Sequence, residues 1–272
     1  MSTRTYYDPL HQSISLNSSI PEEQMVMELI DSSPFQRLRR IKQLGPAYLT
    51  FHGAESSRFT HSLGVFHIAR RAINHLSELD SRLKEHKFIL YAAALLHDLG
   101  HGPLSHTSEE IFKIKHEEWT GKLINENQEI SIILNRYGKG NAKAISELIQ
   151  SRKAPEKSIV SLISSQLDCD RLDYLMRDSY TTGARYGQLD IDRIISAMTL
   201  APDGDLAIQP KGLMAVEHYL VIRNLMYRSV YNHRLNEVCN WLLEQIIKTV
   251  RKQGPKEVWA DQTMTAWLWN HE

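Results

Sequence analysis

The sequence lacks several features that would take it out of the ordinary globular class. It has two cysteines, Cys169 and Cys239, without a paired spacing, which argues against a disulfide framework and a tetrahedral structural zinc site. No apolar run approaches the length of a membrane span, so we expect none. Residues 1–19 lack the apolar core of a signal peptide, and we expect a cytoplasmic protein.

No charge of either sign predominates, because 32 Lys and Arg balance 32 Asp and Glu. A nucleic-acid partner is therefore not indicated by charge, although a local basic pocket is not excluded by this balance. The 272 residues are 42% hydrophobic and 24% charged, which is ordinary for a soluble domain with a large core.

Apolar residues recur mostly at helical spacing, which predicts an all-α bundle with one or two small β-hairpins. The hairpins are expected at residues 6–16 and 199–208, the second turning at Asp203-Gly204. Helices are expected over residues 21–30, 35–41, 62–79, 88–99, 109–127 with a break near His116, 142–150, 158–167, 169–177, 191–198, 213–250 and 256–269.

Three parts of one continuous domain are expected. Residues 1–50 form an arm and helices packed on the core, residues 51–200 form the core that carries the site, and residues 201–272 form a hairpin and long C-terminal helices.

One stretch combines an apolar run with several ionisable side chains. Residues 89–96 are apolar and are followed at once by His97, Asp98, His101 and His106. Buried ionisable groups are costly unless they are paired or bind a metal. A helix end with one histidine complementing the dipole is the simpler alternative, but three histidines and a buried aspartate at a Gly-Pro break favour a metal site.

Two more stretches could complete such a site. Residues 58–65 place His61 near the start of a helix, and residues 164–174 carry a second candidate aspartate. The order His…His-Asp…Asp matches the signature of the HD superfamily, and this resemblance implies His61, His97, Asp98 and Asp170 as the metal ligands. Two imidazoles and two carboxylates suit Mn²⁺, Fe²⁺, Co²⁺ or Ni²⁺, whereas Mg²⁺ would be less usual.

A closer resemblance rests on motifs in register from residue 8 to about residue 234. Asp8-Pro9-Leu10-His11 resembles "DPIHG" of the SAM-and-HD-domain dNTP triphosphohydrolases and their bacterial relatives, with Gln12 in place of the glycine. Five further stretches resemble that family's "FQRLR…IKQLG", "SRFEHSLGV", "LHDLGHGPFSH", "DVDKWDYFARD" and "YQH" segments. They are residues 35–45, 57–65, 96–106, 168–178 and 224–233.

The resemblance implies catalytic roles for histidines beyond the metal ligands. His101, His106 and His116 would lie around the phosphates, with His106 as the general acid for the leaving oxygen and Glu109 orienting it. The pair His116-Glu117 would serve the water network and proton relay. For His116 an ordinary solvated helix face is the alternative, since three charged residues surround it.

The resemblance also implies seven substrate-binding positions, three arginines for phosphates and four residues near the sugar. They are Arg58, Arg171 and Arg223, and Gln43, Tyr174, Asp178 and Tyr231. The alternatives are surface salt bridges for the arginines and core packing for the two tyrosines. Asp31, Gln36 and Arg39 match positions that bind a guanine nucleotide activator in some relatives, and a solvated helix face is the alternative there.

Residues 213–250 are apolar at helical spacing, and Trp241, Trp259, Trp267 and Trp269 lie near their end. A single domain of this size could not cover so long a helix, and exposed apolar area of this kind usually marks an interface. We therefore expect a homodimer or larger homo-oligomer; a kink that folds the segment back is the alternative.

Three functions are compatible with these observations. The first is a metal-dependent dNTP triphosphohydrolase that releases deoxynucleoside and triphosphate. The second is another HD phosphohydrolase, a nucleotide phosphatase or phosphodiesterase. The third is a non-catalytic nucleotide or nucleic-acid-binding module, which the intact ligand positions disfavour.

Overall fold

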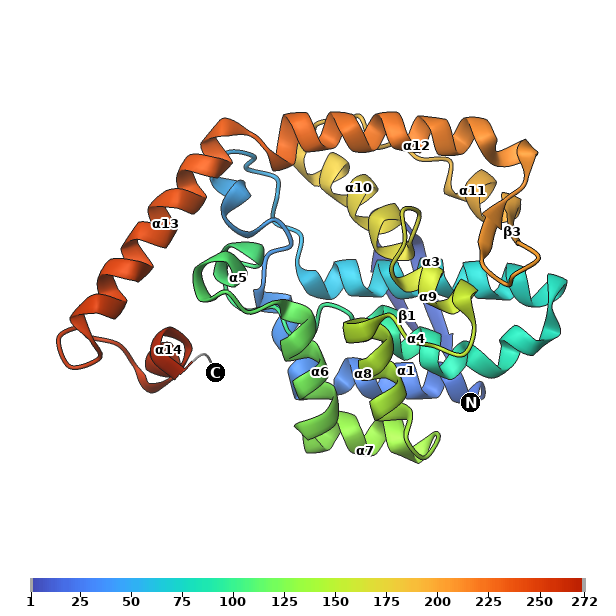
Figure 1. Cartoon of the computed structure of the whole chain (residues 1–272), viewed down its shortest axis with the longest axis horizontal. Coiled ribbons are helices and arrows are strands. Elements are labelled where there is room, and N and C mark those ends of the chain that lie inside the picture. The colour runs from blue at the N-terminus through green and yellow to red at the C-terminus, as the bar shows by residue number, and fades with distance from the viewer. Residues whose placement is uncertain (1, 271–272) are drawn as a thin grey trace.

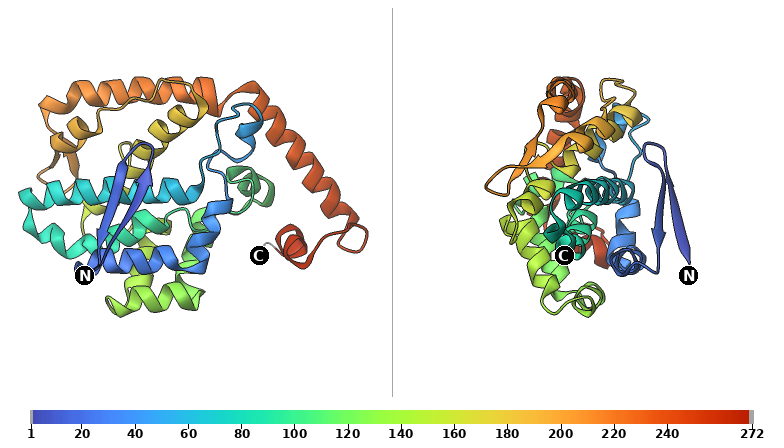
Figure 2. Two further views of the ribbon diagram at one scale, coloured as in Figure 1. Left: turned by 180° about the vertical axis from the view of Figure 1, so that it is seen from behind. Right: turned by 90° about the vertical axis from the view of Figure 1, so that its right-hand side faces the viewer.

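The structure is a computed structural model and describes residues 2–270. The chain begins with an antiparallel hairpin of β1 (Thr3–Asp8) and β2 (Gln12–Asn17). Alternation along β2 buries Ile14 and Leu16 completely. In Figure 2 the hairpin lies along the outside of the helices, next to the N-terminal one.

Helices make up most of the body (Figure 1). Short 3₁₀ turns at Arg37–Arg40, Gly45–Leu49, Ser81–His86 and Pro210–Gly212 connect some of them. The α-helices up to residue 197 are α1 (Pro21–Asp31), α2 (Ser33–Gln36), α3 (Arg58–Leu79), α4 (Lys87–Leu96), α5 (His106–Phe112), α6 (His116–Glu126), α7 (Gln128–Arg136), α8 (Asn141–Ser151), α9 (Lys157–Ile163), α10 (Cys169–Thr182) and α11 (Ile191–Ala197).

The centre of the body is formed by α3, which packs against α4 on one side and against α10 on another. Residues 90–96 of α4 are all buried, because a helix that is apolar on every face is stable only when neighbours surround it. Around it, α1, α8 and α9 bury the remaining faces. The end of α4 therefore lies inside the protein.

The second hairpin consists of β3 (Met198–Leu200) and β4 (Leu206–Ile208), with Met198 opposite Ile208. Its turn contains Gly204 in the left-handed region, at φ +82°, which glycine adopts without strain. The prediction of an all-α fold with two small hairpins is confirmed.

Several predicted boundaries are wrong. The helix α4 ends at Leu96 rather than at residue 99. The helix α10 continues to Thr182, beyond its predicted end at residue 177. The helix α7 was not predicted; its cap is Asn127, whose side chain accepts from the Ile130 backbone N–H. The sequence pattern predicts that Asn127 ends one helix, whereas in the structure Asn127 also caps the next helix.

The predicted segment 213–250 is not continuous. It contains α12 (Leu213–Met226), a π-helical turn (Tyr227–Tyr231) and α13 (Arg234–Gln253), separated at residues 232–233. After α13 the chain is irregular to residue 261 and ends in α14 (Gln262–Thr265) and a second π-helical turn (Ala266–Asn270). The predicted helix over residues 256–269 therefore starts too early.

We call residues 234–270 the C-terminal arm, because α13 points away from the body and α14 lies beside its far end (Figure 1). The arm holds a small apolar cluster of Ile111 from α5, Ile247 and Leu268. Trp267 also packs edge-on against Phe112 of α5, with ring centroids 5.3 Å apart. Among residues 2–270, no helix combines the length and apolar character that crossing a membrane requires.

Candidate metal centre and its surroundings

The first turn of α3 places two side chains in the interior. Ser57 caps this helix by accepting from the Thr60 backbone N–H, so Arg58 and His61 lie within its first turns. His61 is fully buried, and Arg58 is 2% exposed. The Nδ1 of His61 donates to Asp173 Oδ2 over 2.8 Å, which leaves Nε2, on the opposite side of the ring, as the nitrogen that can bind a metal.

The end of α4 supplies the next two side chains. His97 Nδ1 donates to the Ala94 carbonyl over 2.9 Å, so its Nε2 is also directed away from the helix. Asp98 follows directly and is 3% exposed. Residues 97–100 form a turn after the helix. A Cβ on Gly100 would lie 2.3 Å from the Thr120 backbone nitrogen, so the close approach of this turn to α6 requires glycine.

The start of α10 supplies the last candidate ligand. Asp168 caps this helix by accepting from the Arg171 backbone N–H, a role that suits a short carboxylate side chain. Asp170 therefore lies in the first turn, where its carboxylate reaches the two histidines. Its side chain is 34% exposed, so the cluster is open to solvent on the side of α10.

The four side chains implied by the resemblance converge on one point. The Oδ1 of Asp170 lies 3.0 Å from His61 Nε2 and 3.7 Å from His97 Nε2, and the two Nε2 atoms are 3.3 Å apart. Asp98 lies within 3.6 Å of His61 and 3.4 Å of His97. His61, His97 and Asp170 each offer an atom close enough to the others to share one ion at bond lengths of about 2 Å, and Asp98 lies beside both histidines.

The charges in this cluster depend strongly on one another. Burial alone would raise the pKa of Asp170, but hydrogen bonds from His61 and His97 hold that pKa well below its usual value. Burial would lower the pKa of His61, whereas Asp170 and Asp173 raise it to about 10. The carboxylates thus attract positive charge to the place where the imidazole nitrogens meet, as a cation site requires.

Arg58 lies at the edge of this cluster and is held by protein groups. Its guanidinium contacts the carboxylate of Asp98 and the hydroxyl of Ser105, and its Nη2 is 3.4 Å from the Gln43 carbonyl. Sequence analysis gave Asp98 no such partner and gave Ser105 no role. The predicted phosphate contact of Arg58 and sugar contact of Gln43 stay predictions, and the unpaired buried Oε1 of Gln43 is compatible with a hydroxyl ligand.

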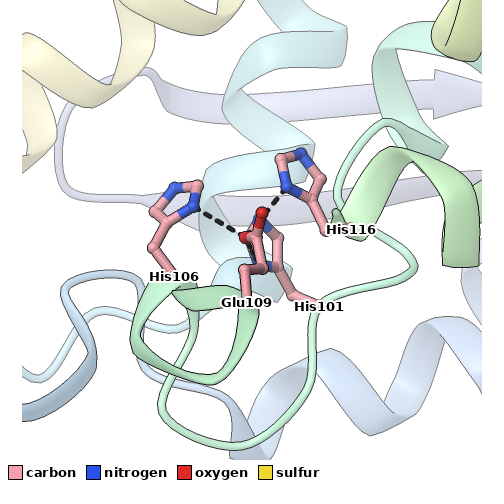
Figure 3. Close-up of side chains that lie close together, drawn as sticks. All are labelled: His101, His106, Glu109 and His116. Carbon is pink, nitrogen blue, oxygen red and sulfur yellow. Dashed lines mark hydrogen bonds and ion pairs between the residues drawn. The ribbon is translucent and has the colours of Figure 1, made fainter. Parts of the chain in front are cut away.

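Three histidines gather around one glutamate beside the metal cluster (Figure 3). The Oε1 of Glu109 lies 2.7 Å from His106 Nδ1, 3.0 Å from His116 Nδ1 and 3.3 Å from His101 Nδ1. His101 and His116 stack with ring centroids 3.8 Å apart. Glu109 and His106 come from α5 and His116 from the start of α6, so the break between these helices brings the groups together.

Within this histidine cluster the rings differ in exposure. The side chain of His106 is 66% exposed, whereas His101 is 1% exposed and its two ring nitrogens make no hydrogen bond. Burial, together with the charge of Arg58, holds the pKa of His101 well below its usual value. The Nε2 of His101 lies 3.2 Å from Asp98 Oδ1. Beside it, Glu117 lies 3.5 Å from His116.

A second polar group lies on α10 and the π-helical turn. Tyr231 donates to Asp178 Oδ2 over 2.9 Å, and its ring stands edge-on to Tyr174 at 5.9 Å between centroids. Burial raises the pKa of Asp178 to about 7, and its Oδ1 has no hydrogen bond. The three predicted sugar-binding residues therefore lie together with one free acceptor.

The two other predicted phosphate ligands lie on this side of the body. Arg171 pairs with Asp168, and Arg223 of α12 donates to Gln166 Oε1 over 2.7 Å. Burial raises the pKa of Asp168 to about 6, with the Asp170 charge adding to that shift. Both arginines therefore already have protein partners, Arg171 in an ion pair and Arg223 in a hydrogen bond to a neutral amide, and their contact with phosphate stays a prediction.

The predicted activator residues lie near the hairpin. Asp31 receives a hydrogen bond of 2.7 Å from Arg4 of β1, and Gln36 accepts one of 2.7 Å from Arg39. Arg39 also covers the ring of Phe59, at 3.6 Å from its centroid. Nothing in these contacts distinguishes a nucleotide site from a hydrogen-bonded surface, so the activator stays a prediction.

Comparison with known proteins agrees with the position of these clusters. The model of the HD domain matches residues 58–178, which include all four convergent side chains, and that of the HD associated region matches residues 189–265. The chain belongs to the HD-domain family. HD domains bind divalent metals, and the two groups His61–His97–Asp170 and His101–His106–Glu109–His116 have the geometry to hold one.

Relatives within the HD-domain family include proteins from distant organisms. The uncharacterized protein YwfO of Bacillus subtilis is 41% identical over 92% of this chain and 56% of its own length. The deoxynucleoside triphosphate triphosphohydrolase SAMHD1 homolog of Dictyostelium discoideum is 32% identical over 80% of this chain and 45% of its own length. The chain thus spans about half the length of the curated relatives it matches.

Among solved structures, a phosphohydrolase from Bacteroides thetaiotaomicron superposes with a TM-score of 0.83 at 32% identity. The match covers 99% of this chain and 64% of that chain. The shared fold therefore extends through the helices that follow the metal cluster.

Proposed function

We propose that this protein is a metal-dependent phosphohydrolase acting on nucleotides, and that it cleaves dNTPs to deoxynucleoside and inorganic triphosphate. The convergence of His61, His97, Asp98 and Asp170 within 3.0–3.7 Å carries this proposal. The relative from Dictyostelium, described as a deoxynucleoside triphosphate triphosphohydrolase homolog, supports the choice of substrate.

The donor set fits a divalent transition metal. Two neutral imidazole nitrogens and two carboxylates suit Mn²⁺, Fe²⁺, Co²⁺ or Ni²⁺ better than Mg²⁺, which prefers oxygen. A bound ion would supply Lewis-acid polarisation of a phosphoryl oxygen and acidification of water. Arg58 compensates part of the charge of Asp98 and holds its carboxylate in place.

The histidine cluster supplies proton transfer. His106 is the most exposed of the three rings, so it can face a substrate and donate a proton to the leaving oxygen. Glu109 fixes the ring of His106 at 2.7 Å and that of His116 at 3.0 Å. His101 lies between Asp98 and Glu109, with Nε2 3.2 Å from the first carboxylate and Nδ1 3.3 Å from the second, while Glu117 supports His116.

The remaining polar groups orient the nucleotide. We assign Arg58, Arg171 and Arg223 to the phosphates, because guanidinium binds phosphate oxygens through paired hydrogen bonds. Gln43, Tyr174, Asp178 and Tyr231 then surround the sugar, where the unpaired Oδ1 of Asp178 could accept from a hydroxyl group.

Analysis of the products from dGTP with Mn²⁺ tests this function. Inorganic triphosphate supports the proposal, orthophosphate or pyrophosphate supports an HD phosphatase or phosphodiesterase, and no turnover supports a binding module. The double variant His97→Ala, Asp98→Ala is expected to lose both bound Mn²⁺ and hydrolysis. His218→Ala, on an exposed part of α12, is the matched control and is expected to retain both.

A further inference from the structure

The motif at residues 8–11 has no role in the function described so far, yet its polar side chains point inward. Asp8 is 8% exposed, and the side chain of His11 is 4% exposed. Both lie at the turn between β1 and β2, where Asp8 is paired with Gln12. Polar groups at a hairpin turn are usually solvated, so their burial calls for a partner inside the protein.

That partner is Asp173, a fully buried carboxylate behind the metal cluster. Its Oδ1 accepts from His11 Nε2 over 2.7 Å and from Arg177 Nη2 over 2.9 Å. Its Oδ2 accepts from His61 Nδ1 and Arg177 Nε, each over 2.8 Å. We propose that Asp8, His11, Asp173 and Arg177 form a positioning network that fixes His61 for metal binding, and so make the N-terminal hairpin part of the metal centre.

Asp173 determines which nitrogen of His61 is available. A carboxylate accepts hydrogen bonds only, so His61 must carry a hydrogen on Nδ1, and Nε2 is the ring nitrogen left for a metal. That Nε2 is the atom 3.0 Å from Asp170 and 3.3 Å from His97. Carboxylates that hold a ligating histidine in this way fix its tautomer and raise its basicity.

Asp8 connects the network back to the hairpin turn. Its Oδ2 accepts from Arg177 Nη1 over 2.9 Å, and its Oδ1 accepts from the backbone N–H groups of Leu10 and His11 at 2.9 and 3.0 Å. Asp8 thus shapes the turn that delivers His11 to Asp173. The hydrogen bonds form a closed circuit from Asp8 through Arg177 and Asp173 to His11.

The packing of α3 against α10 leaves no slack in this network. Gly64 lies one turn after His61, and a Cβ there would stand 1.9 Å from Asp173 Oδ1 and 2.6 Å from Arg177 Nη2. Glycine inside a helix is unfavourable by roughly 1 kcal/mol relative to alanine. Its presence at this point is explained by the close approach of the Asp173–Arg177 pair.

The hairpin has other anchors, which separates its attachment from this proposed role. Ile14 and Leu16 are fully buried, and Arg4 pairs with Asp31 at 2.7 Å on the exposed side. Removing the charge of Asp8 or the ring of His11 should therefore disturb His61 without releasing the hairpin. Arg4→Gln weakens the hairpin at a contact that does not touch Asp173, so it is the matched control.

The proposal rests on the proposed function, and its test measures metal affinity rather than activity. Mn²⁺ affinity is determined by competition with a fluorescent chelator, and the absorption spectrum of bound Co²⁺ reports the ligand environment. Asp173→Asn is expected to weaken Mn²⁺ binding by roughly 10- to 100-fold, as loss of a carboxylate behind a ligand does elsewhere. Asp8→Asn and His11→Phe are expected to weaken it less, and all three to change the Co²⁺ spectrum.

His11→Gln restores a donor that can reach Asp173, and it is expected to bind Mn²⁺ more tightly than His11→Phe. Arg4→Gln should leave affinity and spectrum unchanged. The network would be overturned if Asp8→Asn and His11→Phe bound Mn²⁺ as tightly as the wild type, even if their melting temperatures were lower. These two variants decide the matter if Asp173→Asn does not fold. A wild-type protein that binds no Mn²⁺ would overturn the proposed function as well.

Discussion

The helices α4 and α13 use apolar side chains in opposite ways. Residues 90–96 of α4 are buried without exception, and the helix ends at the metal cluster. In α13, twice as long at 20 residues, Asn236 and Ile247 are the buried ones. Its large apolar side chains with 47–58% exposure are Leu235, Val238, Trp241, Leu242 and Ile246.

This contrast separates what the fold needs from what it leaves for a partner. A helix that is apolar on every face must be enclosed by other parts of its own chain, and α4 is enclosed in this way. An apolar stripe on one face can be covered from outside, and α12 also exposes Leu220 and Leu225. The body is therefore stabilised by internal packing and buried charge pairs, whereas the arm is the surface through which we propose that the protein self-associates.

The largest expected effect on stability comes from the buried charge pair at the end of α4. Asp98→Ala leaves the guanidinium of Arg58, 2% exposed, without its carboxylate, and loss of one partner of a buried pair typically costs about 3–5 kcal/mol. Urea unfolding of the metal-free protein should show this loss. The double variant Arg58→Met, Asp98→Ala should recover part of it; an unchanged urea midpoint for Asp98→Ala would mean that Arg58 finds another partner.

A matched pair of leucines tests the comparison directly. Leu95 in α4 is fully buried and Leu242 in α13 is 47% exposed. Leu95→Ala should lower the free energy of unfolding by about 2–5 kcal/mol because it leaves a cavity, while Leu242→Ala should change it by less than about 0.5 kcal/mol at low protein concentration. Similar losses for both, measured by urea unfolding, would show that the arm is packed as firmly as the body.

The pH dependence of stability should reveal the buried carboxyl group of Asp178. Burial raises its folded pKa to about 7, above its value in the unfolded chain. The folded state therefore binds an extra proton between these two values, and this contribution to stability is lost as pH rises towards 7. The variant Asp178→Asn has no carboxyl group to ionise and should not lose stability in this way. Its free energy of unfolding minus that of the wild type should therefore increase from pH 4 to pH 8, by on the order of 1–3 kcal/mol.

Thermal unfolding of the wild type and Asp178→Asn across that pH range measures this difference. Asp178 and Tyr231 are also assigned to the substrate, so the comparison is made without nucleotide. A constant difference between the two proteins at all pH values would show that Asp178 is ionised throughout.

The smallest effect on unfolding is expected for a substitution on the arm. The same substitution should clearly lower the molecular mass of the protein in solution. Trp241 is 58% exposed within the stripe, and Trp241→Glu should change the stability of the body by less than about 0.5 kcal/mol. Light scattering at micromolar concentration should find the wild type as a dimer or larger, and the variant nearer the 31.4 kDa of one chain. A monomeric wild type would refute self-association through this surface.

Helical spacing was sufficient to predict most elements, and it failed where local signals are ambiguous. Asn127 can end one helix or cap the next, and α7 was missed because of it. The interruption at residues 232–233 carries neither glycine nor proline, so the sequence gives no strong breaker. That interruption follows the turn that brings Tyr231 to Asp178, and its effect becomes visible only in three dimensions.

The sequence by itself determined the class of fold and the kinds of donor at the site, because periodicity and residue type are local properties. Only the tertiary structure showed what surrounds three aspartates at the beginning of α10: Asp168 caps the helix, Asp170 lies beside the two histidines, and Asp173 holds His61 from behind. Spacing on one helix tells which side chains share a face, but not which neighbour that face meets. Here the neighbour is α3, where His61 lies 112 residues from Asp173 along the chain, and packing across that separation assigns the roles.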